Sequence, residues 1–390
     1  MQPPIARNAA DSFPAATLLD ALHDIMLARR NRNAMAIRLL SIAVLVMIRV
    51  GFANSAWGAD RVVVIRDGQP RTLSGEILDY TGSELKLKTA AGREETIPGS
   101  QVKSVETQWS DEQMSADKKR ESGDFQAALD EYRQAQTAEK RLWVKRRIAA
   151  WTVVCHRQLG DWRRATELFS TLHRNDPTTP YFDCIPLSWT PMEPDSNLNR
   201  WATGLLQEEK PAIETLIACS LLISLGDRSV AVAALEQLTL GKTTQEKRAR
   251  DKSSDERISQ LAEAQLWRPR VVKANSADLE LWRAAIERMP TNIRPGPWFV
   301  LGQGLSRQER RSESALAFLR GPIAQMPDRL LAAESFLAAG KELERMGRVE
   351  ETATLYREIV ADYPFSSAAR EASQWLAKPA AASAKSTQGK

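Results

Sequence analysis

The side chains that could do chemistry are few and widely spaced in this sequence. Gly241-Lys242-Thr243 has the ending of a phosphate-binding loop, but Glu236 stands where that loop needs glycine. His156 and His173 are the only histidines after residue 59, and they have neither metal-ligand spacing nor a nucleophilic serine motif to serve. Paired acids such as Glu208-Glu209 lie in polar stretches that indicate solvated surface. We therefore expect a protein that is not an enzyme and that needs no metal and no cofactor.

The three cysteines, Cys155, Cys184 and Cys219, are far apart in the sequence. This is not the arrangement of a disulfide framework or of a zinc site. Cys155 and Cys219 lie in apolar helical segments, where a free cysteine packs as a small core residue. The alternative is one disulfide between Cys184 and another cysteine, formed after export.

The charge of the chain argues against one broad class of partner. The 390 residues carry a formal net charge of +5, but residues 1–59 hold six Arg against three Asp, which leaves 48 basic and 46 acidic residues in the remainder. Nucleic-acid binding needs a clustered basic face. We therefore expect no nucleic-acid partner.

The N-terminal segment has the features of a secretory signal. The apolar run Leu39–Ile48 follows Arg38 and precedes small residues between Ala53 and Ala59, where a signal peptidase could cut. Its ten residues are too few to span a bilayer, which takes about 20. We expect translation to start at Met35 and the mature protein to be exported, to the periplasm or elsewhere in the cell envelope. The alternative is an uncleaved signal that anchors the chain in the inner membrane.

Residues 60–107 are expected to form a small five-stranded β-barrel. Short runs of β-formers alternate with glycine-containing turns, and Leu85 and Leu87 alternate with lysines as a strand with one buried face requires. The runs are Val62–Ile65, Glu76–Tyr80, Glu84–Thr89, Glu94–Ile97 and Val102–Val105. This pattern resembles SH3-like and Sm-like barrels. An SH3-like groove needs several exposed rings, and Tyr80 is the only aromatic residue of the segment.

Most of the remaining sequence follows one helical pattern. Gly123-Asp124-Phe125 and Gly160-Asp161-Trp162 stand 37 residues apart, and apolar residues follow each at the same offsets. These residues are Ala128, Tyr132 and Ala135 in the first copy, and Ala165, Phe169 and Leu172 in the second. Two further copies cover Trp298–Pro327 and Gly340–Pro364. The pattern resembles the tetratricopeptide repeat (TPR), in which a pair of antiparallel helices recurs every 34 residues or so.

The middle of the chain is less regular. Ala212–Ser224 and Arg228–Leu240 resemble the two helices of a HEAT-like hairpin around Gly226-Asp227. The Pro-rich stretch Asp183–Asn197 indicates a linker or a packed crossing. Residues 241–256 are polar and are expected to form a solvated loop.

These patterns divide the chain into six segments. They are an N-terminal extension with signal peptide (1–59), an SH3-like β domain (60–107), TPR repeats (108–177), HEAT-like or degenerate repeats (178–290), TPR repeats (291–377) and a disordered tail (378–390). The fold class is therefore multidomain α and β, mainly an α-solenoid behind a small β-barrel. Since the strand pattern ends near Glu106, we expect the two parts to fold separately.

The TPR resemblance implies a groove lined by the first helix of each repeat. The offsets of that inner face select Arg120, Arg147, Arg157, Gln158, Gln303, Arg307, Lys341 and Arg345 as candidate protein-binding residues. Arginine recurs among them, and its planar guanidinium suits carboxylates, including a free C-terminus. The neighbouring acids Asp117, Glu121, Glu334 and Glu344 could neutralise these cations and leave an ordinary mixed-charge surface.

The sequence therefore predicts a non-catalytic scaffold of the cell envelope that binds a protein or peptide partner. The last repeat, from Tyr356 to Leu376, is similar to repeats of bacterial envelope TPR proteins that coordinate outer-membrane assembly or division. The alternative is an accessory subunit that binds a wall polymer or a peptide through the SH3-like barrel.

Overall fold

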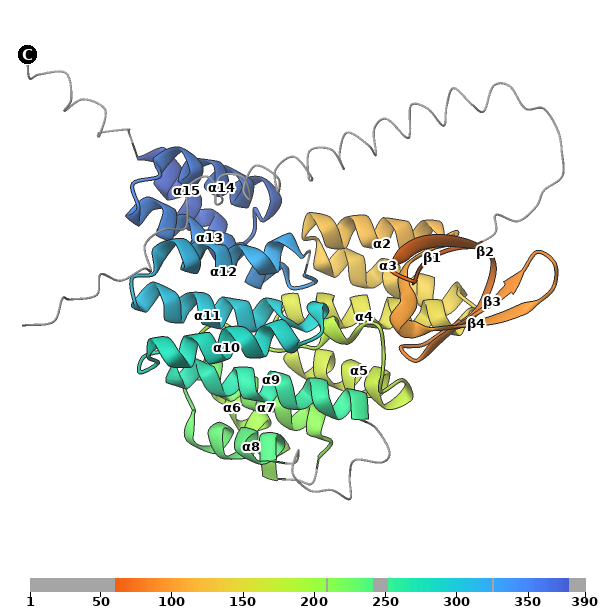
Figure 1. Cartoon of the computed structure of the whole chain (residues 1–390), viewed down its shortest axis with the longest axis horizontal. Helices are drawn as coiled ribbons and strands as arrows, with labels where there is room; N and C mark the ends of the chain where they lie inside the picture. The colour runs from red at the N-terminus through yellow and green to blue at the C-terminus, as the bar shows by residue number, and fades with distance from the viewer. Residues whose placement is uncertain (1–59, 208–209, 241–251, 325, 379–390) are drawn as a thin grey trace, which may run out of the picture. The chain divides into compact units, whose positions relative to one another are not determined.

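A computed structural model describes residues 60–207, 210–240, 252–324 and 326–378. Within these ranges a five-stranded antiparallel sheet precedes fourteen α-helices (Figure 1). This confirms the expected fold class of a small β domain followed by helices arranged as in a solenoid. The signal segment, the Met35 start, the tail from residue 379 and Gly241-Lys242-Thr243 lie outside the described residues.

Four of the five strands coincide closely with the runs expected from the sequence, whereas the second begins at Gln69, before its expected run Glu76–Tyr80. The five strands are β1 (Asp60–Arg66), β2 (Gln69–Tyr80), β3 (Glu84–Thr89), β4 (Glu94–Pro98) and β5 (Val102–Glu106), in the order β4-β3-β2-β1-β5. Asp67 and Gly68 both have positive φ, 54° and 73°, as a two-residue hairpin turn between twisted strands requires. The register of β2 against β3 shifts between Ile77 and Asp79, which is where β2 bends.

The helices follow in sequential antiparallel pairs (Figure 1). They are α2 (Asp111–Ser122), α3 (Phe125–Ala138), α4 (Leu142–Gln158), α5 (Trp162–Asn175), α6 (Ser196–Gln207), α7 (Ala212–Leu225), α8 (Ser229–Leu240), α9 (Lys252–Arg270), α10 (Ser276–Arg288), α11 (Pro295–Arg307), α12 (Arg311–Ile323), α13 (Arg329–Arg345), α14 (Val349–Asp362) and α15 (Ser367–Ala377). Three short 3-10 helices are η1 (Gly99–Gln101), η2 (Phe182–Cys184) and η4 (Thr291–Ile293). Because α9 begins at Lys252, the last part of the stretch 241–256 is helical, not loop.

Four hairpins turn in the same way. Gly123, Gly160, Gly226 and Gly347 each follow the first helix of a pair with a left-handed φ between 75° and 94°. Glycine adopts this conformation without the steric cost that a Cβ brings. In the α11–α12 pair the positive φ falls on Glu309, at 60°.

Small residues let paired helices approach closely. A methyl group at Gly302 would lie 2.7 Å from the Phe318 ring, and one at Gly340 would lie 2.2 Å from Tyr356 Cε1. The Ser314 hydroxyl donates to the Gly302 carbonyl at 2.8 Å, and Thr352 makes the equivalent bond to Gly340 at 3.4 Å. Equivalent positions in the two hairpins therefore make equivalent contacts.

The sheet and the first helices share one apolar core. Buried side chains run without interruption from Val62 and Leu85 in the sheet to Ile148 in α4. Trp143 Nε1 donates to the Ile77 carbonyl at 3.2 Å across this interface. The β domain is therefore packed on α4 and is not joined to it only by a linker.

The early and late hairpins also touch. The guanidinium of Arg157, near the end of α4, forms an ion pair with Asp328, the N-cap of α13. Gln158 Nε2 donates to Asp328 Oδ1 at 3.2 Å, and the Phe365 ring lies over Gly123. These contacts close α4 against α13, so inner positions that would otherwise be open to solvent are covered.

Candidate binding site

The eight residues selected as groove candidates fall into two groups of four. Arg120, Arg147, Arg157 and Gln158 make contacts inside the protein, on α2 and α4. Gln303, Arg307, Lys341 and Arg345 line a cavity on the inner side of α11 and α13. The structure brings the second group together and separates it from the first.

Arg120 and Arg147 hold one carboxylate between the first helices. Arg147 pairs with Asp117 at 2.8 Å, and Arg120 Nε donates to the Tyr132 hydroxyl at 3.1 Å, which in turn donates to Asp117. The Arg120 guanidinium also lies 4.0 Å from the centroid of the Trp151 ring. Asp117 is thus the acid that satisfies both arginines, and their fork geometry stabilises the fold.

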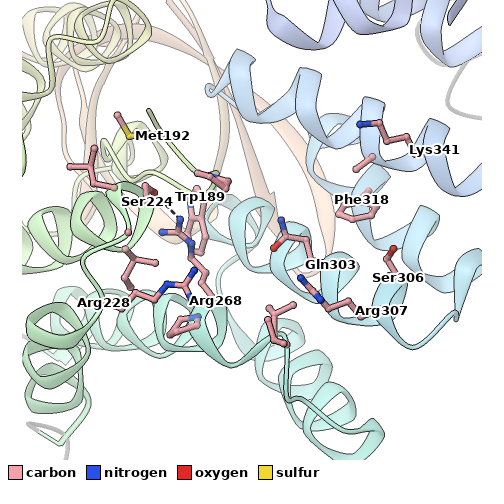
Figure 2. Close-up of a pocket in the computed structure, with 18 of the residues that line it drawn as sticks. Trp189, Met192, Ser224, Arg228, Arg268, Gln303, Ser306, Arg307, Phe318 and Lys341 are labelled. Atoms are coloured by element: carbon pink, nitrogen blue, oxygen red, sulfur yellow. Dashed lines mark hydrogen bonds between the residues drawn. The ribbon is translucent and has the colours of Figure 1, made fainter. Parts of the chain in front are cut away.

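A cavity of about 600 Å³ lies between the two halves of the helical array. Figure 2 shows Arg228 and Arg268 on one side of it and Gln303, Arg307 and Lys341 on the other. Five cations line it: Arg228, Arg268, Arg307, Lys341 and Arg345. We call this space, defined by these five residues, the cationic cavity.

The described lining of the cationic cavity contains one acid, and that acid is already paired with cations of the protein. Glu342 on α13 is 2% exposed. It accepts from Ser306 at 2.6 Å and pairs with Arg345 and, at 3.4 Å, with Arg311. Lys341 pairs with Glu371, outside the cavity, at 2.8 Å. Two of the five cations are thereby neutralised.

The other three cations have no carboxylate partner among the residues that the structure describes. Arg228 and Arg307 are exposed at the cavity wall. Arg268 is half-buried, and its NH1 donates to the Ser188 and Ser220 carbonyls at 3.0 and 3.1 Å, while NH2 donates to Ser224 Oγ at 2.7 Å. These neutral acceptors satisfy the hydrogen bonds of Arg268 but leave its charge uncompensated.

Desolvation of the guanidinium and, to a smaller extent, the neighbouring positive charge of Arg228 together lower the pKa of Arg268 to about 9. A pKa of about 9 keeps the guanidinium protonated at neutral pH. The cavity therefore concentrates positive charge in a partly enclosed space, where an anion is attracted more strongly than on an open surface.

Arg268 also fixes the Pro-rich crossing. Ser188 N donates to Ser220 Oγ at 3.2 Å and Met192 N donates to the Ser224 carbonyl at 2.9 Å. Leu187 and Trp189 are buried, so the crossing is a packed segment and not a linker. It forms one wall of the cationic cavity.

Sequence reasoning missed Arg228 and Arg268. Both lie in segments read as helical, but no repeat offset assigned them to the inner face. Their only signal is that Arg268 lies in the last turn of α9, beside Pro269, and that Arg228 follows the Gly226-Asp227 turn.

The described cysteines and histidines have structural surroundings. No group of three His, Cys, Asp or Glu side chains there could hold a metal ion. Cys155, Cys184 and Cys219 are free and buried, and burial raises the pKa of each thiol, which makes them unreactive core residues. His156 bonds to Asp161 at 3.0 Å at the α4–α5 turn.

The β domain presents no ring for ligand stacking within its described residues. Tyr80 packs against the shared core, and burial, followed by the nearby Asp176, raises its pKa to about 12. Arg146 donates to the Tyr80 carbonyl at 2.6 Å. This face of the sheet therefore serves the interface with α4.

The fold and the cavity define a helical-hairpin protein with a cationic inner cavity, preceded by a small antiparallel sheet. Comparisons of the sequence with models of protein families and with curated proteins give no match. No helix in the described ranges has both the length and the apolar character needed to cross a membrane.

Proposed function

We propose that this protein is a non-catalytic scaffold of TPR and HEAT-like repeats that binds an acidic segment of a partner protein in the cationic cavity. The observation that carries the proposal is the set of three arginines, Arg228, Arg268 and Arg307, that face one cavity without carboxylate partners in the described structure. Carboxylates of a partner would supply that missing charge through bidentate bonds to the guanidinium groups.

The repeat assignment is supported by recurring contacts. The left-handed glycine at four turns and the glycine-on-ring packing at Gly302 and Gly340 are what the TPR pattern requires of its small and aromatic positions. The α7–α8 pair turns at Gly226 in the same manner, which supports the HEAT-like hairpin. The SH3-like assignment of the sheet is supported by its five antiparallel strands and by the register shift in the long second strand.

We also propose export to the cell envelope, on the basis of the apolar run Leu39–Ile48 between arginines and its small flanking residues. N-terminal sequencing of protein purified from its native cells tests this. A mature chain that begins between Ala53 and Ala59 supports export with cleavage. A chain that still contains Ala36 refutes cleavage.

The binding proposal is tested by fluorescence anisotropy with a labelled peptide of about ten residues that carries a cluster of aspartates in a Gly-Ser background. The test variant is Arg228→Ala/Arg307→Ala, because neither side chain has a hydrogen-bond or ion-pair partner in the described structure whose loss would disturb folding. Each exposed charge pair contributes about 0.2–1 kcal/mol. The double variant should therefore bind roughly 2- to 30-fold more weakly.

The matched control removes two arginines elsewhere. Arg133 and Arg164 are exposed on α3 and α5, each beside an acid of its own helix. Arg133→Ala/Arg164→Ala loses the same net charge and should leave the affinity within twofold or so. Raising the salt concentration should weaken the wild-type complex and narrow the difference between the variants. Equal affinities for all three proteins would refute the cationic cavity as the binding site.

A further inference from the structure

Arg268 is held in place by neutral groups of the protein. Its Nη1 donates to the Ser188 and Ser220 carbonyls and, at 2.8 Å, to Gln265 Oε1. Its Nη2 donates to Ser224 Oγ. These acceptors belong to the Pro-rich crossing, to α7 and to α9 itself. They fix the orientation of the guanidinium without neutralising it, so Arg268 is already positioned when a ligand arrives.

Two N–H groups of Arg268 remain for a ligand. A guanidinium has five N–H groups, and the acceptors above take the two on Nη1 and one on Nη2. The Nε–H and the second Nη2–H have no acceptor in the described part of the chain. Arg268 lines the cationic cavity, and its Nε retains accessible surface. Because Nε and Nη2 are bonded to the same carbon, they can hold the two oxygens of one carboxylate.

Arg228 lies on the same wall of the cavity as Arg268 (Figure 2). It is exposed and has no hydrogen-bond or ion-pair partner in the described structure, and its positive charge acts on Arg268. Two like charges held near one another attract an anion more strongly than either does alone. We call these two arginines the Arg268 subsite, which has room in its hydrogen bonding for one carboxylate.

The opposite wall, on α11 and α13, offers one cation without a carboxylate partner in its described lining. Lys341 is paired with Glu371. Arg345 is paired with Glu342, which leaves Arg307. The Arg307 side chain is exposed, and no described group accepts from it. Arg307 therefore supplies charge at this wall but no fixed geometry.

We propose that the partner segment carries two acidic residues, one bound by the Arg268 subsite and one bound by Arg307 across the cavity, and that Arg268 determines the specificity. The inference rests on the proposed function and names its ligand more closely. A compact space of about 600 Å³ is about 10 Å across, and an extended chain covers that distance in about three residues. The preferred segment therefore has two acids with two residues between them.

The two acids are recognised in different ways. A fixed pair of donors favours a carboxylate that meets it in the correct geometry, whereas an exposed cation responds mainly to charge. Lysine retains the charge of arginine but lacks its planar fork. Replacement of Arg268 or Arg307 with lysine therefore separates the requirement for geometry from the requirement for charge.

The first test varies the ligand on the unmodified full chain. Labelled Gly-Ser peptides carry one aspartate, or two aspartates with zero to six residues between them, and fluorescence anisotropy measures their affinities. The peptide with two intervening residues should bind about 3- to 10-fold more tightly than those with adjacent or most widely separated aspartates. Equal affinities across the two-aspartate series would overturn the two-subsite arrangement.

The second test compares lysine variants at the two walls. Arg268→Lys should weaken the best two-aspartate peptide about 10-fold or more, because the carboxylate loses its paired donors. Arg307→Lys should weaken it only about two- to threefold. Urea unfolding checks both variants, since Arg268 also fixes the crossing. Equal losses of affinity in two folded variants would show that Arg268 does not determine the specificity.

Arg307→Ala locates the second acid without disturbing the crossing. It should weaken the two-aspartate peptide several-fold more than the one-aspartate peptide, and it decides the inference together with the spacing series if Arg268→Lys does not fold. Arg164→Ala, on α5, is the control and should change neither affinity. If Arg307→Ala weakens both peptides equally, the inference is overturned and the proposed function stands. If no acidic peptide binds wild type, both are overturned.

Discussion

Replacing Asp328 with asparagine tests the ion pair that joins α4 to α13. Asp328 accepts from Leu331 N at 3.1 Å as the N-cap of α13 and pairs with the buried guanidinium of Arg157. Asparagine caps helices as well as aspartate does, so Asp328→Asn retains the cap and removes only the charge. The substitution thereby isolates the ion pair.

The expected loss of stability follows from the burial of both partners. Arg157 is 7% exposed and Asp328 is 8% exposed. Removing one partner of a buried ion pair costs about 3–5 kcal/mol, because the remaining charge stays desolvated. The asparagine oxygen can still accept one bond from Arg157, which places the expectation near the lower end, about 3 kcal/mol. For a chain of this size that corresponds to a fall in Tm of roughly 4–5 °C.

The assay is thermal and urea unfolding followed by circular dichroism, with Asp124→Asn as the control. Asp124 caps α3 by accepting from Ala127 N at 3.2 Å, but it is exposed and forms no ion pair within the described residues. Its substitution should cost less than about 0.5 kcal/mol. Combining Arg157→Met with Asp328→Asn should cost less than the sum of the two single changes, since no lone charge remains buried. Equal stability of Asp328→Asn and Asp124→Asn would refute the reasoning.

Three further perturbations probe other parts of the fold. Gly340→Ala places a methyl group 2.2 Å from the Tyr356 ring and should cost about 1–3 kcal/mol by urea unfolding; Gly347→Ala, where nothing lies within 4 Å but φ is 75°, should cost only about 1 kcal/mol. Burial raises the pKa of Asp183 from 3.8 to about 6. Its ionisation therefore destabilises the folded state as the pH rises from about 4 to 6. Asp183→Asn should stabilise the folded protein by on the order of 2 kcal/mol at pH 7 but not below pH 4. A fragment of residues 108–377 loses the sheet half of the shared core and should melt well below the full chain; an unchanged Tm would show that the helices need no sheet.

The sequence predicts most strands and helices, but it does not predict the interface between the sheet and α4. Alternation at Leu85 and Leu87 predicts a strand with one buried face, and the structure confirms it. The same alternation says nothing of what covers that face. We expected the β domain and the helical part to fold separately. The hydrogen bond from Trp143 in α4 to Ile77 in β2, 66 residues away in the sequence, weakens that expectation because it joins the two parts.

The groove residues show the same limit at the level of side chains. Helical periodicity places Arg120, Arg147 and Arg307 on inner faces, but it cannot tell a covered face from an open one. The acid Asp117 lies within reach of the first two, as the mixed-charge interpretation allowed. Arg307 has no such acid in the described surroundings, because the neighbouring Glu342 is already paired with Arg345 and Arg311.

Arg268 links the stability of the cavity to its occupancy. Its bonds to Ser188, Ser220 and Ser224 fix the crossing that forms one wall, and a neutral donor in place of Arg268 would suffice if structure were its only role. A buried charge without a counter-charge destabilises the folded state, as the lowered pKa of this guanidinium reflects. That cost disappears when an anion enters the cavity, so the free energy released there adds directly to the affinity for an acidic ligand. The uncompensated positive charge of Arg268 in the cationic cavity is therefore better explained by a role in anion binding than by a role in folding.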